Sequence, residues 1–205
     1  MDLMSEVWDK IIQVRMHGRG GQGAALASAI LALAVFKEGK YVNSFPGFGS
    51  ERRGAPVATF VKVSEEELMP KCKVYQADML TIFDNTLIDL PVVFDGLKEN
   101  GLILINVPAE EQEKIIGRLK KELNVPKGVR VFMVDASNIA IKAGLGAGAI
   151  PAINAAMLGA FAKASGLVQM DSLIEALKER LPANMEKNID AARKAHASVE
   201  EVGTI

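Results

Sequence analysis

The chain has 205 residues, of which 49% are hydrophobic and 24% charged, a composition typical of a folded globular domain. Its 24 Lys and Arg residues balance 25 Asp and Glu residues, and the net charge of −1 gives no global field that would attract nucleic acid or an anionic membrane. These figures exclude a tethered multi-domain enzyme, and we predict a single domain over residues 1–205.

The cysteine content and the distribution of apolar residues restrict the compartment. Cys72 is the single cysteine, so the chain forms no internal disulfide and cannot hold an iron-sulfur cluster by itself, which needs several thiolates. The longest apolar run, residues 24–36, is too short to cross a bilayer, and the acidic first residues lack the basic start of a signal peptide. We therefore expect a cytoplasmic protein without a membrane partner.

Predicted strands and helices alternate along most of the chain. The predicted strands are residues 10–16, 41–43, 57–63, 79–83, 102–106 and 129–134. The predicted helices are residues 24–36, 92–100, 110–123, 154–165, 173–181 and 185–197. This order predicts one three-layer, doubly wound (Rossmann-like) α/β domain with a largely parallel sheet and a helical C-terminal part.

Local signals refine this prediction. The helix over residues 24–36 is apolar all round, so we expect it to be buried on most faces. Gly101 is expected to end the helix over residues 92–100, and Ser172 with Glu175 to form a capping box that opens the helix after it. Two prolines and three glycines in residues 45–56 predict a long loop without regular structure.

The first candidate site is the glycine-rich turn Gly18-Arg19-Gly20-Gly21-Gln22-Gly23, which lies between a predicted strand and a predicted helix. Glycines let the backbone approach an anion, and free N–H groups at a helix start favour negative charge, so the turn suits phosphate. A nicotinamide or flavin site should also carry an acid about 20 residues further on. Here the second strand ends at Asn43-Ser44 and Glu38 precedes it, which weakens the dinucleotide interpretation. In the alternative interpretation, the glycines serve only a tight turn and close helix packing.

The second candidate is the loop at residues 45–56, which presents Arg52 and Arg53 side by side. If the strands before the two motifs are parallel, both motifs lie at the same edge of the sheet and can flank one anion. Guanidinium groups suit phosphate oxygens. The alternative is a solvated arginine pair held by Glu51. Phe45 and Phe48 are expected either to stack on a ring or partner, or to pack under the loop.

The histidines and the cysteine suggest no further chemistry. His17 precedes the glycines without a nearby Cys, Asp or second His, and it is interpreted as a hydrogen-bonded structural residue. Cys72 has no positioned histidine, so it is a poor candidate nucleophile. We predict no metal site and no catalytic residue in this chain.

Together the two motifs resemble the gamma subunit of 2-oxoacid:ferredoxin oxidoreductases, in particular of pyruvate:ferredoxin oxidoreductase (pyruvate synthase). The resemblance covers nearly the whole chain: residues 17–23, 45–56, 96–101, 154–161 and 187–193. Gly47 and Ser50 depart from the family pattern, where Glu and Pro are expected, while the Arg-Arg-Gly-Ala-Pro segment is intact.

The resemblance implies one subunit of a larger enzyme, which decarboxylates a 2-oxoacid, with pyruvate as first choice, and uses coenzyme A to give acyl-CoA, CO2 and reduced ferredoxin. It implies alpha, beta and delta partner subunits that carry thiamine diphosphate and the iron-sulfur clusters. The gamma subunit is then expected to close over coenzyme A, to bind none of those cofactors alone and to be inactive in isolation. The predicted coenzyme A-binding residues are Gly18, Arg19, Gly20, Gly21, Gln22, Gly23, Ser50, Arg52 and Arg53.

Two other functions stay open at this point. One is a free-standing dinucleotide-binding oxidoreductase, which the glycine-rich turn favours and the missing acid disfavours. The other is a purely structural subunit that holds the alpha and beta chains together.

Overall fold

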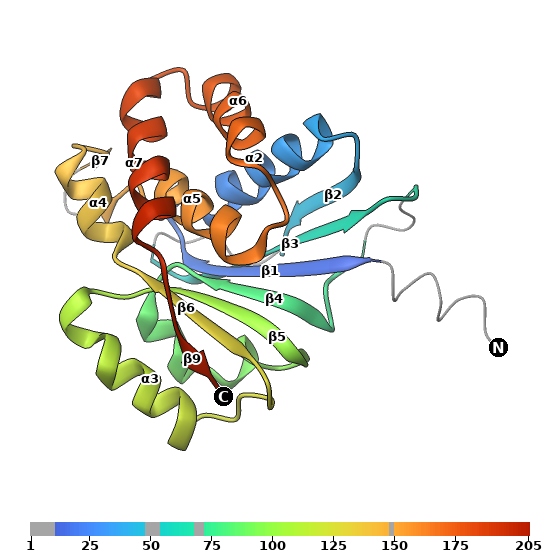
Figure 1. The fold of residues 1–205 in the computed structure, drawn as a ribbon, viewed down its shortest axis with the longest axis vertical. Helices are drawn as coiled ribbons and strands as arrows, with labels where there is room; N and C mark the ends of the chain where they lie inside the picture. The colour runs from blue at the N-terminus through green and yellow to red at the C-terminus, as the bar shows by residue number, and fades with distance from the viewer. Residues whose placement is uncertain (1–10, 48–53, 68–71, 148–149) are drawn as a thin grey trace.

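The computed structural model describes residues 11–47, 54–67, 72–147 and 150–205. A seven-stranded sheet with the strand order β2-β3-β1-β4-β5-β6-β9 runs through the molecule (Figure 1). Its strands are β1 (Ile12–Arg19), β2 (Tyr41–Pro46), β3 (Pro56–Ser64), β4 (Ala77–Ile82), β5 (Leu97–Asn106), β6 (Arg130–Val134) and β9 (Glu200–Thr204). A separate small hairpin pairs β7 (Gly146–Ala147) with β8 (Ile150–Pro151).

Helices cover both faces of the sheet, as expected for three layers. The α-helices are α2 (Ala24–Lys37), α3 (Gln112–Lys121), α4 (Ala136–Lys142), α5 (Asn154–Ser165), α6 (Met170–Arg180) and α7 (Met185–Ser198). Short 3₁₀ turns are η1 (Asn85–Asp89), η2 (Pro91–Val93) and η3 (Ala109–Glu111). Figure 1 shows α2, α5, α6 and α7 on one side of the sheet and α3 on the other. The predicted doubly wound α/β class is therefore confirmed.

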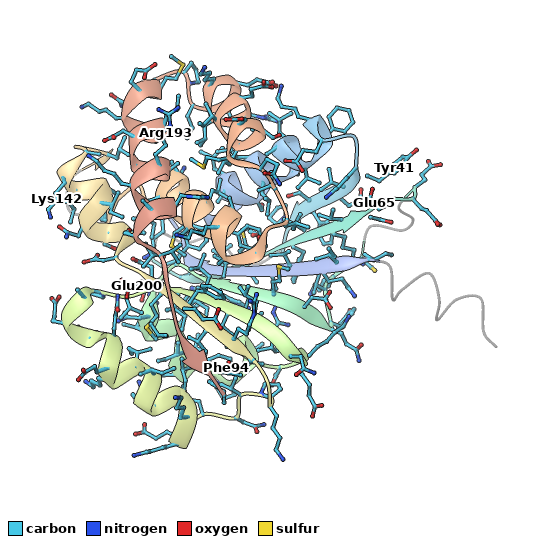
Figure 2. All side chains as sticks on the ribbon, in the orientation of Figure 1. Tyr41, Glu65, Phe94, Lys142, Arg193 and Glu200 are labelled. Carbon is cyan, nitrogen blue, oxygen red and sulfur yellow. The ribbon has the colours of Figure 1, made fainter. Side chains whose placement is uncertain are left out.

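The centre of the sheet is parallel and its outer strands are antiparallel. β1, β4, β5 and β6 pair in parallel, whereas β3 runs antiparallel to both β1 and β2, and β9 runs antiparallel to β6. A parallel crossover needs a dozen or more residues, and the segment between Pro46 and Pro56 is shorter than that, so β2 and β3 must reverse direction. β1 and β2 consequently point the same way, and their carboxyl ends share one edge of the sheet. Figure 2 shows Tyr41 and Glu65 at the opposite edge, where β2 starts and β3 has just ended.

Two hydrophobic clusters lie on the two faces of the sheet. One joins Val14 and Met16 of β1 to the layer of α2 and α5, and the other joins Leu80 and Ile103 to η1, η2 and α3. α2 packs against the sheet, α5 and α6, in agreement with the prediction that it is buried on most faces, and only one side of the helix is left open. Leu26 and Phe36 keep 38% and 67% of their surface exposed.

Three local predictions were wrong. Residues 92–100 form the end of η2, a turn and the start of β5 rather than a helix, and Gly101 lies inside β5. Pro91 permits one tight turn, and the β-branched residues Val92 and Val93 that follow it disfavour a continuing helix. The second strand was predicted over residues 41–43, but β2 continues to Pro46. A proline is tolerated there because β2 is an edge strand.

The capping box at Ser172 and Glu175 is absent, because α6 begins earlier, after its N-cap Gln169. The Glu38 carboxylate, at the end of α2, accepts the backbone N–H of Gln169 at 2.6 Å and supplies the cap from a distant part of the chain. The sequence reading also missed α4 and β9. In the described parts of the chain, no helix is both long and apolar enough to cross a membrane.

Candidate functional site

The glycine-rich turn joins the end of β1 to the start of α2, as the motif predicts. Gly21 and Gly23 have φ angles of 102° and 87°, in the left-handed region that favours glycine. Gly18 serves close packing, because a Cβ atom there would lie 3.0 Å from Ala24 Cβ and 3.4 Å from Phe83 Cβ. A tight turn and close helix packing both contribute to the motif.

Backbone hydrogen bonds join the glycine-rich turn to the end of the arginine loop, which is the segment at residues 45–56 that carries Arg52 and Arg53. The Gly20 N–H donates to Ala55 O at 2.9 Å, and the Gly54 N–H donates to Gly20 O at 3.0 Å. Ser50, Arg52 and Arg53 lie outside the described residues. Gly54 and Ala55, which directly follow the arginines, therefore lie beside the glycine-rich turn at the same edge of the sheet, as expected.

The side chain of Arg19 is hydrogen-bonded to three protein groups. Its Nε donates to Asp84 Oδ2 at 3.1 Å, Nη1 to Gly54 O at 3.2 Å and Nη2 to Thr86 Oγ1 at 2.7 Å. Gln22 takes part in the same network, since its Nε2 donates to Asp84 Oδ2 at 3.0 Å and its Oε1 accepts the Arg19 N–H at 2.7 Å. These two side chains brace the turn.

Asp84 stays ionised in this network. Burial would raise the pKa of its carboxyl group, but hydrogen bonds from Thr86 and Gln22 and the charge of Arg19 outweigh burial and lower it. Sequence reasoning missed Asp84 as a site residue. The available signal was its position two residues after the end of β4, at the carboxyl end where ligands bind in such sheets.

The free donors of the turn are backbone amides. Among the described residues, the N–H groups of Gly21 and Gly23 have no hydrogen-bond acceptor. The first amides of an α-helix also lack partners within the helix and carry partial positive charge. The turn lies between β1 and β4, whose following connections leave toward opposite faces of the sheet, and such a switch point is where open α/β sheets bind ligands. This arrangement is suited to an anion.

His17 is buried beside this site and uncharged. Burial, with a smaller effect from the nearby charge of Arg15, lowers the pKa of His17 from 6.5 to about 3. Its Nε2 atom has no hydrogen-bond partner among the described residues. A histidine in this state is too weak a base to accept a proton near neutral pH.

Other candidates lie away from the turn. Glu38 caps α6, so it is not placed to hold a ribose. Cys72 accepts a hydrogen bond from Lys62 Nζ at 2.9 Å and lines a cavity of about 420 Å³ near Gln13, at the amino end of β1. The described parts of the chain contain no group of three His, Cys, Asp or Glu residues that could hold a metal ion.

Comparison with known proteins identifies relatives that match most of the chain. Residues 13–198 match the family described as pyruvate ferredoxin/flavodoxin oxidoreductase. A "pyruvate/ketoisovalerate oxidoreductases common subunit gamma" of Pyrococcus furiosus is 44% identical over 93% of this chain and 98% of its own. A "pyruvate synthase subunit PorC" of Methanothermobacter marburgensis is 41% identical over 94% of this chain and 100% of its own.

A solved structure agrees in fold. The crystal structure of the pyruvate oxidoreductase subunit PORC of Thermotoga maritima superposes with a TM-score of 0.77 at 29% identity, covering 95% of this chain and 99% of that one. The chain belongs to the pyruvate ferredoxin/flavodoxin oxidoreductase family. Within that family it corresponds over its length to the separate gamma subunits.

Proposed function

We propose that this chain is the gamma subunit of a pyruvate-using 2-oxoacid:ferredoxin oxidoreductase and helps to bind coenzyme A in the assembled enzyme. The observation that carries the proposal is the junction of the glycine-rich turn with the arginine loop, through Gly20, Gly54 and Ala55. Coenzyme A carries a pyrophosphate and a 3′-phosphate. Backbone amides at the start of α2 and two guanidinium groups next to Gly54 in the sequence are donors suited to those phosphates.

The same proposal assigns the expected residues two kinds of role. The amides of Gly21 and Gly23, with Arg52 and Arg53, contact the phosphate, while the Gly20 amide joins the turn to Ala55. Gly18, Arg19 and Gln22 give the turn its shape, since their space or donors are used inside the protein. Ser50 is proposed to add a hydroxyl donor.

The rest of the reaction belongs to partner subunits in this proposal. Alpha, beta and delta chains bind thiamine diphosphate and the iron-sulfur clusters and pass electrons to ferredoxin, while this chain alone binds none of these groups. A cluster needs several thiolates, and the sequence has one cysteine. Relatives are named as a gamma subunit common to pyruvate and ketoisovalerate oxidoreductases, which supports a gamma subunit that leaves the choice of 2-oxoacid to its partners.

Steady-state kinetics of the assembled complex tests the coenzyme A role. Arg52→Ala and Arg53→Ala are each expected to raise the KM for coenzyme A about tenfold to a hundredfold, because a charge-assisted hydrogen bond contributes roughly 1.5 to 3 kcal/mol. The KM for pyruvate should not change. Arg180→Ala, on the exposed end of α6, is the matched control. The isolated chain, assayed in parallel, is expected to show no turnover.

The outcomes separate the competing functions. Unchanged coenzyme A kinetics in both arginine variants would reject the binding role. Loss of assembly in both variants would favour a purely structural subunit. Flavin or nicotinamide bound to the isolated chain, seen by absorbance, would favour a dinucleotide-binding oxidoreductase.

A further inference from the structure

We propose that Asp84 is a positioning residue for anion binding: from the end of β4 it holds the glycine-rich turn in the shape that presents its amides. The inference rests on the proposed function and deepens it, because Asp84 belongs to neither sequence motif. It lies 62 residues from Gln22 and 65 from Arg19 along the chain.

The carboxylate uses both of its oxygens. Oδ2 accepts Arg19 Nε and Gln22 Nε2, and Oδ1 accepts the backbone N–H of Thr86 at 3.0 Å together with the Thr86 hydroxyl. The Thr86 bonds fix the carboxylate at the start of η1, where Asp84 is the N-cap. The other oxygen is thereby aimed at the turn.

From Asp84 the constraint passes to the backbone through Gln22. With its Nε2 on Asp84, the amide group of Gln22 directs Oε1 to the Arg19 N–H at 2.7 Å. The Gln22 N–H in turn donates to Arg19 O at 3.0 Å, which closes the turn. The amides of Arg19, Gly20 and Gln22 are occupied within the protein, and those of Gly21 and Gly23 are left for an anion.

Asp84 also neutralises the charge of the Arg19 guanidinium group. Its ion pair with Arg19 joins the carboxyl end of β4 to that of β1, with the aspartate side chain 17% exposed and the arginine side chain 35% exposed. A guanidinium group neutralised in this way supports the turn but competes little for a phosphate. The structure therefore assigns Arg19 to bracing, and the attraction for the anion to the amides and to other cations.

The test compares three variants in the assembled complex. Asp84→Asn turns one acceptor oxygen into an amide donor, which opposes the Gln22 Nε2 donor. We expect the KM for coenzyme A to rise about tenfold, the size of one lost hydrogen-bond contribution, with kcat and the KM for pyruvate within about twofold. Gln22→Glu alone should have a similar effect, because two carboxylates then face each other.

Combining the two substitutions provides the rescue. In the double variant the introduced asparagine amide donates to the introduced glutamate, so the coenzyme A KM should return to within about threefold of the parent value. Asp135→Asn is the matched control. It is the N-cap carboxylate at the end of β6, on the same edge of the sheet, and accepts Asn138 N–H at 3.0 Å without touching the turn.

Hydrogen exchange of the full chain without coenzyme A gives a second readout. The Arg19 amide should exchange faster in Asp84→Asn and in Gln22→Glu than in the parent or the Asp135→Asn control. Unchanged exchange at Arg19, or a double variant no better than the single ones, would overturn the positioning role. If exchange responds as expected while the coenzyme A KM is unchanged in these variants and in the Arg52 and Arg53 variants, the coenzyme A function itself fails.

Discussion

The two faces of β1 are equally buried but chemically opposite. Val14 and Met16 point toward the α2 and α5 layer with 0% exposure, while Gln13, Arg15 and His17 point to the other face with only 6 to 7% exposure. An alternating strand usually keeps its polar face in water. A central position with cover on both faces overrides this tendency, and the polar side chains must then find partners inside the protein.

The two faces differ in what offsets the cost of burial. The apolar face loses no hydrogen bonds on burial and gains contact with α2 and α5. On the polar face, Arg15 Nη2 donates to Val93 O at 2.9 Å and to Asp95 O at 2.6 Å, but Arg15 Nε and His17 Nε2 have no acceptor or donor among the described residues. We expect the apolar face to stabilise the fold more than the polar one.

Met16→Ala should have the largest effect on this comparison. Truncating a fully buried methionine leaves a cavity, and we expect the free energy of unfolding to fall by about 3 kcal/mol. Urea denaturation of the full chain at pH 8 measures it. Ile141→Ala, at a side chain that is 63% exposed, is the control and should change stability by less than about 0.5 kcal/mol. Equal effects would contradict the importance of the apolar face.

His17 should make stability depend on pH. The pKa of His17 is about 3 in the folded chain and has its ordinary value of 6.5 in the unfolded chain, so below pH 6.5 the unfolded chain binds a proton that the folded chain does not. The stabilisation is present above pH 6.5 and is lost as pH falls toward 3. Between pH 8 and pH 5 the loss should be about 2 kcal/mol.

His17→Gln is the variant that checks this pH effect. Denaturation of parent and variant at pH 8 and pH 5 should show a smaller pH dependence in the variant, by about 2 kcal/mol. His196→Gln, on α7, is the control for the second histidine of the chain. A pH dependence that survives in His17→Gln would contradict the neutral buried state of this side chain.

Arg15→Met should have the smallest effect of the three. The change removes two hydrogen bonds to backbone carbonyls but also removes a charge whose burial is costly, as the lowered pKa of Arg15 indicates, with Asp95 acting against that shift. We expect a loss of about 1 kcal/mol in the free energy of unfolding at pH 8. A loss larger than that of Met16→Ala would reverse the ranking of the two faces.

The features predicted correctly from sequence are those that neighbouring residues determine. The turn between β1 and α2 follows from its glycines, and the helix predicted over residues 154–165 is α5, which is followed by Gly166 with a φ of 63°. The shared edge of the two motifs could also be predicted, because β1 and β2 point the same way. The position of the candidate site could therefore be predicted from two short sequence motifs.

The features missed depend on residues far apart in sequence. Glu38 caps α6 across 131 positions, and Asp84 reaches Gln22 across 62, so no local pattern announces either contact. The start of β5 was mistaken for a helix because Leu97-Lys98-Glu99-Asn100 has no strong strand propensity, and pairing with β4 decides its conformation. The arginines of the second motif remain a prediction.

The outward side of α2 has a consequence for handling the protein. Leu26 and Phe36 are exposed on a helix that carries no charged residue before Lys37, and the chain as a whole has a net charge of only −1. Molecules with so little charge repel one another weakly, and exposed apolar surface favours their association. Colloidal stability of the separate chain should therefore be lowest near its pI of about 6.2 and in strongly salting-out buffers, and preparation at pH 8 in moderate salt is the better choice.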